Sequence, residues 1–143
     1  MDRYDVLKLD KQLCFPLYAC SREMIKEYKP FLDSLELTYT QYITMMVLWE
    51  KKSINVKALG DQLYLDSGTL TPLLKKLESK GLVSRRRSSE DERNLIVSIT
   101  EAGEALKEQA VNIPTEVVKC ANLTKEECQI LYNILYKFLN RNK

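Results

Sequence analysis

Four leucines at helical spacing, followed by a glycine and a hairpin pattern, constrain this chain more than any other feature. They recur at i, i+3, i+4 and i+7: Leu70, Leu73, Leu74 and Leu77. This stripe predicts a helix over residues 67–80 with one buried face, and Gly81 ends it. Residues 82–87 and 94–100 have the pattern of two strands, joined by a charged turn at 88–93. The stretch therefore predicts a helix packed beside a β-hairpin.

The opposite face of this helix carries short hydroxyls and cations: Ser67, Thr69, Thr71, Lys75 and Lys76. Hydrogen-bonding side chains on a helix suit base edges in the major groove, whereas cations suit phosphates. Residues 75–87 hold six cations, Arg85 and Arg86 among them, against Glu78 alone, although the whole chain has a formal charge of only +2. We therefore expect these residues to bind double-stranded DNA.

The charged turn adds a second feature of DNA-binding modules. Asp91 stands two residues before Arg93, so its carboxylate can hold the guanidinium in an extended pose for the minor groove. A solvated helix beside a surface hairpin with ordinary ion pairs is the alternative interpretation. The hairpin after the basic helix favours a winged helix-turn-helix, a mainly α fold with a small β-hairpin wing.

Helices flank this module on both sides. We expect a first helix over residues 12–28 closed by Pro30, a break at 53–55 before the module, and a long helix from Glu101 that Pro114 interrupts. The helix over 67–80 contains a proline, so it either starts near Thr69 or is distorted in its second turn. Other helix starts carry capping residues: Thr38 with Gln41, Asn55, Thr100, and Thr124 with Glu127.

These flanking helices have apolar faces that a second copy of the chain can cover. We therefore expect one domain over 1–143, with the winged module at about 53–100 and dimerisation helices at about 10–30 and 101–141. A homodimer would present two reading helices to a pseudo-palindromic operator whose half-sites lie about 34 Å apart.

The composition excludes several classes of chemistry. No apolar run approaches the ~20 residues that span a bilayer, and the first residues lack a signal-peptide core, so we expect a cytoplasmic protein without a membrane partner. Four cysteines in such a chain argue against a disulfide framework. Because the chain has no histidine and no CxxC, we expect no His-based catalysis, no metal and no cofactor.

Cys14 is placed near the start of the first helix, where the helix dipole favours a thiolate. A cysteine at an apolar helical position is nevertheless more often a small buried hydrophobe. Tyr18 is one turn away and can touch Cys14. Tyr28 is about 21 Å away along a straight helix and cannot reach it within one chain. In a dimer with antiparallel first helices, Tyr28 of the partner subunit can.

Two stretches resemble the MarR family: LCFPLYACSREMIKEYKPFLDSLELTYTQY, and LGDQLYLDSGTLTPLLKKLESKGLVSRRRSSEDERNLIVSITEAG. The pattern LCFxLY is similar to that of the organic-hydroperoxide-sensing repressors within the family. The resemblance covers the chain to about Pro114 and is weaker beyond. It implies a homodimeric repressor that is not an enzyme, with an organic hydroperoxide as its effector.

The resemblance also implies roles for particular residues. Cys14 matches the peroxide-sensing cysteine, Tyr28 and Tyr39 match tyrosines that hydrogen-bond its sulfur across the dimer, and Tyr18 matches a further tyrosine of that pocket. Oxidation of Cys14 to a sulfenic acid would then release the operator. The oxidised sulfur forms a disulfide either with a second cysteine, for which Cys120 is the candidate, or with a low-molecular-weight thiol.

Three other functions compete with this one. A regulator of the same fold can be gated by a small aromatic or lipid ligand, with Cys14 incidental. A regulator with the same thiol can control global or virulence genes. The sequence does not distinguish this function, because it differs only in the genes that are regulated. A thiol peroxidase would use Cys14 catalytically, but it would give no reason for the basic wing.

Overall fold

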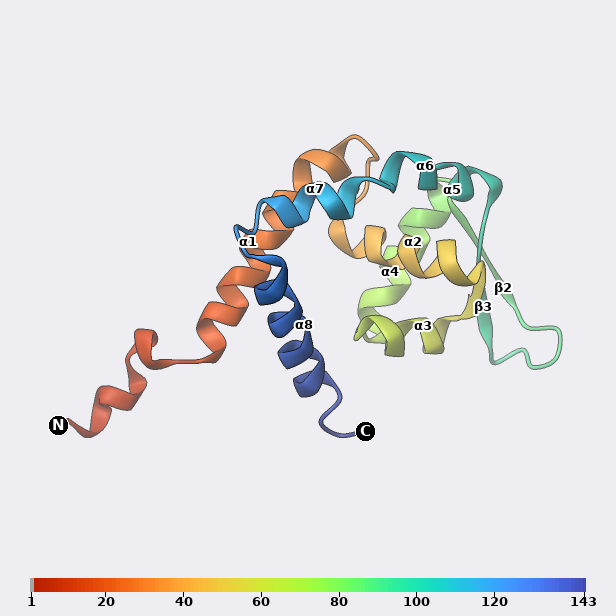
Figure 1. Cartoon of the computed structure of the whole chain (residues 1–143). Helices are drawn as coiled ribbons and strands as arrows, with labels where there is room; N and C mark the ends of the chain where they lie inside the picture. The colour runs from red at the N-terminus through yellow and green to blue at the C-terminus, as the bar shows by residue number, and fades with distance from the viewer. Residues whose placement is uncertain (1) are drawn as a thin grey trace.

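The computed structural model describes residues 2–143, which form eight α-helices, two short 3-10 turns and a three-stranded sheet. The elements are, in order, η1 (Arg3–Leu7), η2 (Leu9–Lys11), α1 (Cys14–Asp33), α2 (Tyr39–Lys51), β1 (Ser53–Asn55), α3 (Val56–Leu63), α4 (Ser67–Ser79), β2 (Val83–Arg87), β3 (Leu95–Ile99), α5 (Glu101–Ala105), α6 (Lys107–Ala110), α7 (Ile113–Lys119) and α8 (Lys125–Leu139). Figure 1 shows α2 to α4 and the sheet gathered into one module. The arm of α1 and the helix α8 project from it, and the β2–β3 hairpin extends on the far side.

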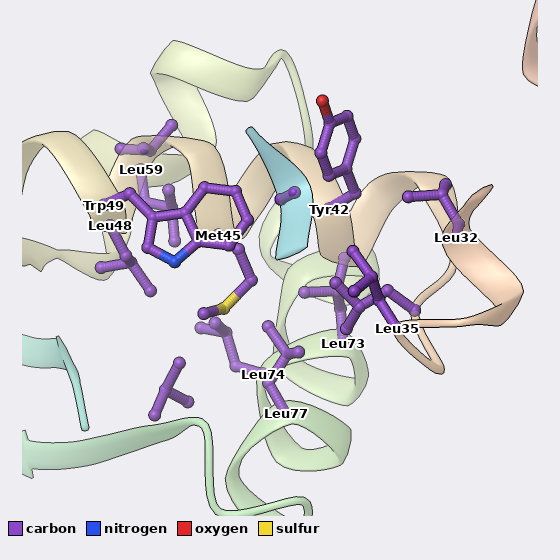
Figure 2. Packing of buried hydrophobic residues seen from close by; sticks show 14 of the residues in the cluster. Leu32, Leu35, Tyr42, Met45, Leu48, Trp49, Leu59, Leu73, Leu74 and Leu77 are labelled. Atoms are coloured by element: carbon purple, nitrogen blue, oxygen red, sulfur yellow. The ribbon is translucent and has the colours of Figure 1, made fainter. Parts of the chain in front are cut away.

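Helix α2 lies at the centre of the core. Thr38 and Gln41 form the reciprocal capping box that their spacing predicts, which fixes where α2 begins. Met45 and Leu48 are completely buried in α2, and Figure 2 shows Met45 pointing toward Leu74 and Leu77 of α4. The leucine stripe of α4 is buried throughout, as its spacing predicts. Packing on α2 therefore determines which face of α4 stays exposed.

Helix α4 begins at Ser67 rather than at Thr69, because Asp66 caps it by accepting a hydrogen bond from the Thr69 amide at 2.8 Å. Pro72 lies inside the helix, where its missing amide hydrogen removes one intrahelical bond. Four buried leucines hold the helix together across that gap. Gly81 follows with a positive φ of 78°, which a glycine adopts without strain.

The expected break at 53–55 does separate two helices, but the sequence did not predict that these residues form the strand β1, which pairs antiparallel with β3. Ile54 lies opposite Val97, and Val97 in turn lies opposite Arg85 of β2. The wing is thus part of a three-stranded sheet in the order β1-β3-β2. Three residues are too few to show strand alternation, and their partner strand is more than forty residues away in the sequence, so the local pattern gave no sign of it.

Helix α1 is longer than the sequence predicts and continues through Pro30 to Asp33. The prolyl ring removes one backbone hydrogen bond, but the turn beyond it is anchored because Leu32 is 2% exposed in the core. Pro16 lies in the first turn, where amide groups have no intrahelical acceptor in any case. None of the helices within residues 2–143 is long and apolar enough to cross a membrane.

The long helix expected from Glu101 is divided into α5, α6 and α7. Pro114 lies in the first turn of α7 and accounts for the second interruption, as predicted. The first interruption, at Leu106, has no proline and was not predicted. Thr124 and Glu127 form the second capping box, which begins α8. The single-domain boundaries stay a prediction.

Gly103 in α5 leaves no room for a side chain, and replacing it with alanine should destabilise the fold. A Cβ at this position would lie 2.3 Å from the Leu82 carbonyl oxygen and 2.7 Å from a side-chain carbon of Ile99. We expect Gly103→Ala to lower the free energy of unfolding by about 2–3 kcal/mol, measured by urea denaturation at fixed protein concentration.

Gly68→Ala is the matched control, because the nearest atom to its added Cβ would be Asp66 Oδ1 at 3.5 Å. Gly68 lies in a helix, so this variant should be as stable as the wild type or slightly more stable. Equal stability of the two variants would contradict the close packing at Gly103.

Candidate nucleic-acid interface and thiol site

The exposed face of α4 carries the polar residues that the sequence assigns to DNA binding. All five are exposed in the structure: Ser67, Thr69, Thr71, Lys75 and Lys76. The Asp66 carboxylate, which begins this helix, accepts hydrogen bonds from the Thr69 backbone and side chain, and these lower its pKa. It therefore stays charged as a cap, and the hydroxyls and ammonium groups of α4 face outward together.

The turn of the wing holds Arg93 as the sequence predicts. Asp91 Oδ1 lies 3.1 Å from Arg93 Nε, and Asp91 Oδ2 lies 3.2 Å from a terminal nitrogen of the same guanidinium. The side chain of Arg93 is nevertheless 90% exposed. The hydrogen bonds from Arg93 lower the pKa of Asp91, so the pair is ionised at neutral pH. Two hydrogen bonds from one carboxylate hold the guanidinium of Arg93 in place, which suits insertion into the minor groove of DNA.

The two cations of β2 assigned to DNA binding differ in their surroundings. Arg86 is exposed, whereas the side chain of Arg85 is only 18% exposed and pairs with Glu78 of α4 at 3.0 Å. Arg87, which the sequence counts among the cations without assigning it a role, is exposed as well. The two exposed arginines of the strand are therefore Arg86 and Arg87.

Cys14 is the first residue of α1 and is exposed. Leu13 precedes it as the N-cap residue and makes no side-chain cap hydrogen bond to the first amide groups of α1. Tyr18 is also exposed, and its hydroxyl accepts a hydrogen bond from Arg22 at 2.7 Å. Because α1 runs unbroken from Cys14 past Tyr28, the two residues are about 21 Å apart along it.

Tyr28 and Tyr39 come together in the structure, and Tyr42 joins them. The ring centroids are 5.0 Å apart for Tyr28 and Tyr39, 5.7 Å for Tyr28 and Tyr42, and 6.3 Å for Tyr39 and Tyr42. We assigned Tyr42 no role from the sequence, although its i+3 spacing from Tyr39 places it on the same face of the helix. We call these three residues the tyrosine cluster.

The tyrosine cluster consists of neutral phenols. Burial raises the pKa of all three hydroxyls, and neighbouring phenols add to the shift for Tyr28 and Tyr42. The pKa of Tyr42 reaches about 12. These groups therefore keep their protons at neutral pH and can donate hydrogen bonds to an anion.

Cys120 is the C-cap residue of α7, a helix that packs against α1. Its sulfur lies 3.7 Å from the Glu116 carbonyl oxygen. Partial desolvation raises the pKa of the Cys120 thiol, and so do a hydrogen bond with Glu27 and the charges of Glu27 and Glu116. Cys120 is thus less thiolate-like at neutral pH than an ordinary cysteine.

Comparison with known proteins links these features to a family. A family model described as transcriptional regulator SarA/Rot matches residues 26–110. An organic hydroperoxide resistance transcriptional regulator of Bacillus subtilis (strain 168) is 51% identical over 138 residues, which cover 96% of this chain and 94% of the relative.

Two solved structures of AbfR, a protein of Staphylococcus epidermidis, are similar over nearly the whole fold. The structure of reduced AbfR bound to DNA has a TM-score of 0.79 and 31% sequence identity, and covers 98% of each chain. The structure of overoxidized AbfR bound to DNA has a TM-score of 0.77, with 31% identity and the same coverage.

Proposed function

Because this chain belongs to the MarR family of transcriptional regulators, in the branch of the organic hydroperoxide resistance regulators, we propose that it is a repressor whose peroxide sensor is Cys14. One observation carries the proposal: an exposed cysteine begins α1, and a cluster of neutral phenols lies on α1 and α2 beyond its reach. A second copy of the chain can bring the two together.

Apolar side chains exposed along α1 and α8 support a homodimer. On and beside α1 they include Leu13, Phe15, Leu17, Tyr18 and Ile25; on α8 they include Ile130, Leu131, Tyr132, Ile134 and Phe138. No residue of α8 is buried within the protomer. Two helices with this much exposed apolar surface need a partner, and a symmetric copy covers both.

In this dimer Tyr28 and Tyr39 of one protomer meet Cys14 of the other. Their hydroxyls donate hydrogen bonds to the sulfur and stabilise its thiolate without any histidine, and the start of α1 adds its dipole. Tyr18 completes the pocket from the side of the cysteine. Phe15 and Leu17, exposed apolar residues within one helical turn of Cys14 in the sequence, would favour an organic over an inorganic peroxide.

The sensing step is an oxidation of sulfur by two electrons. The thiolate attacks one peroxide oxygen, an S–O bond forms, the O–O bond breaks, and the alkoxide that leaves takes up a proton to become an alcohol. The resulting sulfenic acid condenses with a thiol to give a disulfide and water. A sulfur in either form no longer accepts the same phenol bonds, so the two protomers shift and the DNA is released.

Double-stranded DNA binds at α4 and the wing in this proposal. Ser67, Thr69 and Thr71 face the major groove, Lys75, Lys76 and Arg86 face the phosphates, and Arg93, held by Asp91, enters the minor groove. Two copies of α4 then read a pseudo-palindromic operator, and their spacing is the quantity that oxidation changes.

A groove beside the tyrosine cluster bears on the rival ligand-gated function. It lies between α2 and α6–α7, is lined by Met46, Trp49 and Val111 among others, and has a volume of about 210 Å³. Pockets for drug-sized ligands occupy about 300–1,000 Å³. This groove is therefore small for an aromatic or lipid effector, although a surface hollow beside Pro114 and Cys128 reaches about 560 Å³.

Replacing Cys14 with serine should abolish the response to peroxide without abolishing DNA binding. The test uses a duplex that the reduced wild type selects from a random pool. We expect an organic hydroperoxide to weaken wild-type binding about tenfold or more, and to leave the affinity of Cys14→Ser unchanged. Cys20→Ser, on the same helix, is the matched control and should respond like the wild type. Release of DNA from oxidised Cys14→Ser would refute the assignment.

Mixed dimers test whether the tyrosines act across the dimer. One chain carries Cys14→Ser, and the other carries Tyr28→Phe and Tyr39→Phe. A shared site leaves one complete pocket in the mixed dimer, so its single Cys14 should form sulfenate at the wild-type rate. The Tyr28→Phe, Tyr39→Phe homodimer should react about tenfold more slowly. A mixed dimer as slow as that homodimer would place the tyrosines in the same protomer as their cysteine.

The raised pKa of Cys120 favours a low-molecular-weight thiol as the partner of oxidised Cys14. Protein oxidised by an organic hydroperoxide with free cysteine present should show, by intact mass under non-reducing conditions, a monomer with one cysteinyl adduct. Cys120→Ser should give the same adduct. A disulfide-linked dimer that disappears in Cys120→Ser would instead identify Cys120 as the resolving residue.

A further inference from the structure

Arg85 lies in the most basic stretch of the chain, yet its contacts point inward. We infer that Arg85 and Glu78 form a strut that positions the wing against the reading helix, and that Arg85 makes no phosphate contact. This inference rests on the proposed DNA binding by α4 and the wing. It separates Arg85 from Arg86 and Arg87, its neighbours on the same strand.

The strut joins two elements through one carboxylate. Glu78 Oε1 accepts a hydrogen bond from a terminal nitrogen of the Arg85 guanidinium at 3.0 Å, and Glu78 Oε2 accepts one from the Arg85 backbone amide at 3.1 Å. Glu78 lies in the last turn of α4, and Arg85 is the middle residue of β2. A single side chain of the reading helix thus fixes both the backbone and the side chain of the wing.

Strand geometry places Arg85 on the inner face of β2, and Glu78 holds it there; Arg87 shares that face but is exposed. Side chains alternate between the two faces of a strand, so Val83 and Arg85 share a face, and Val83 is 2% exposed in the core. Arg85 Nε is buried and makes no hydrogen bond among the described residues, so this guanidinium faces inward and its side-chain partner there is Glu78. Arg86 points to the opposite face and is exposed.

The position of the strut lets it act on the whole sheet. Arg85 is paired with Val97 of β3, which is completely buried and is paired in turn with Ile54 of β1. Fixing the middle of β2 therefore fixes the direction in which the β2–β3 hairpin leaves the core. The distance from Arg93 at the tip to the face of α4 depends on this direction.

The negative charge of Glu78 makes it possible to distinguish a positioning role from a purely electrostatic effect on DNA binding. Glu78 is the one carboxylate among six cations in residues 75–87. If charge alone mattered, Glu78→Gln would tighten DNA binding, because a negative group near the phosphates is removed. If Glu78 positions the wing, Glu78→Gln weakens binding, since the neutral amide no longer holds the guanidinium and the backbone amide together.

The test measures affinity against salt concentration for the selected duplex, using the wild type, Glu78→Gln, the charge-neutral double variant Glu78→Gln with Arg85→Gln, and Arg86→Gln. Removing one cation–phosphate interaction lowers the slope of log affinity against log salt by about 0.9, hence by about 1.8 in a dimer. We expect Arg86→Gln to show this change. The double variant should bind about tenfold more weakly at every salt concentration with an unchanged slope.

Two outcomes would overturn the inference: a double-variant slope that falls as it does in Arg86→Gln, or tighter binding by Glu78→Gln. Helical circular dichroism of each variant should match that of the wild type, and Glu78→Gln, the mildest substitution, decides the sign if the double variant is poorly folded. Failure of the wild type to select any duplex would refute the proposed function instead. If the wild type selects a duplex and releases it on oxidation, the proposed function stands, and the variants then test the inference about Arg85 alone.

Discussion

The contact between Trp49 and Gly103 is the constraint on which the rest of the fold depends. The indole Nε1 donates a buried hydrogen bond to the Gly103 carbonyl at 2.9 Å, 54 residues along the chain. The glycine allows α5 to lie directly on the root of the wing, where any side chain would meet the Leu82 carbonyl. Thr100 strengthens the same junction by donating to the Gly81 carbonyl at 2.6 Å. Helix α2, the end of α4, the wing and the start of the C-terminal helices are therefore fixed to one another at a single point.

This junction also limits which movements an oxidation near the tyrosine cluster can cause. Trp49 contacts Tyr42 with ring centroids 6.4 Å apart, and Tyr42 belongs to the tyrosine cluster. The cluster and the reading helix are thus parts of the same packed core, which moves as a unit because close-packed interiors deform little. A chemical change at the cluster cannot move α4 far within its own protomer. In the proposed dimer, a change at the partner's Cys14 can instead rotate one protomer against the other. The length of α1 is consistent with this, because it keeps Cys14 about 21 Å from Tyr28 of the same chain.

Much of this was accessible from sequence because it is local. The capping residues Thr38 and Asn55 fix helix starts through bonds that span three residues, and the hairpin follows from its own alternation. The failures are non-local. Strand β1 exists only through its pairing with β3, and Pro30 is tolerated only because the next turn packs on the core. In the sequence, Arg85 is one of three consecutive arginines. Only its ion pair with Glu78 of α4 distinguishes it from Arg86 and Arg87.

The carboxylates of the DNA-facing module show how the basic surface is built. Asp66, Glu78 and Asp91 each accept hydrogen bonds, from Thr69, Arg85 and Arg93 respectively, and these bonds lower the pKa of all three. A carboxyl whose pKa is lowered by folding contributes stability above its unfolded pKa and loses that contribution as the pH falls through its folded value. At neutral pH all three are ionised and hold their partners. One begins the reading helix, one sets the wing against it and one aims the arginine at the tip, so negative charge determines the geometry of a surface made to bind a polyanion.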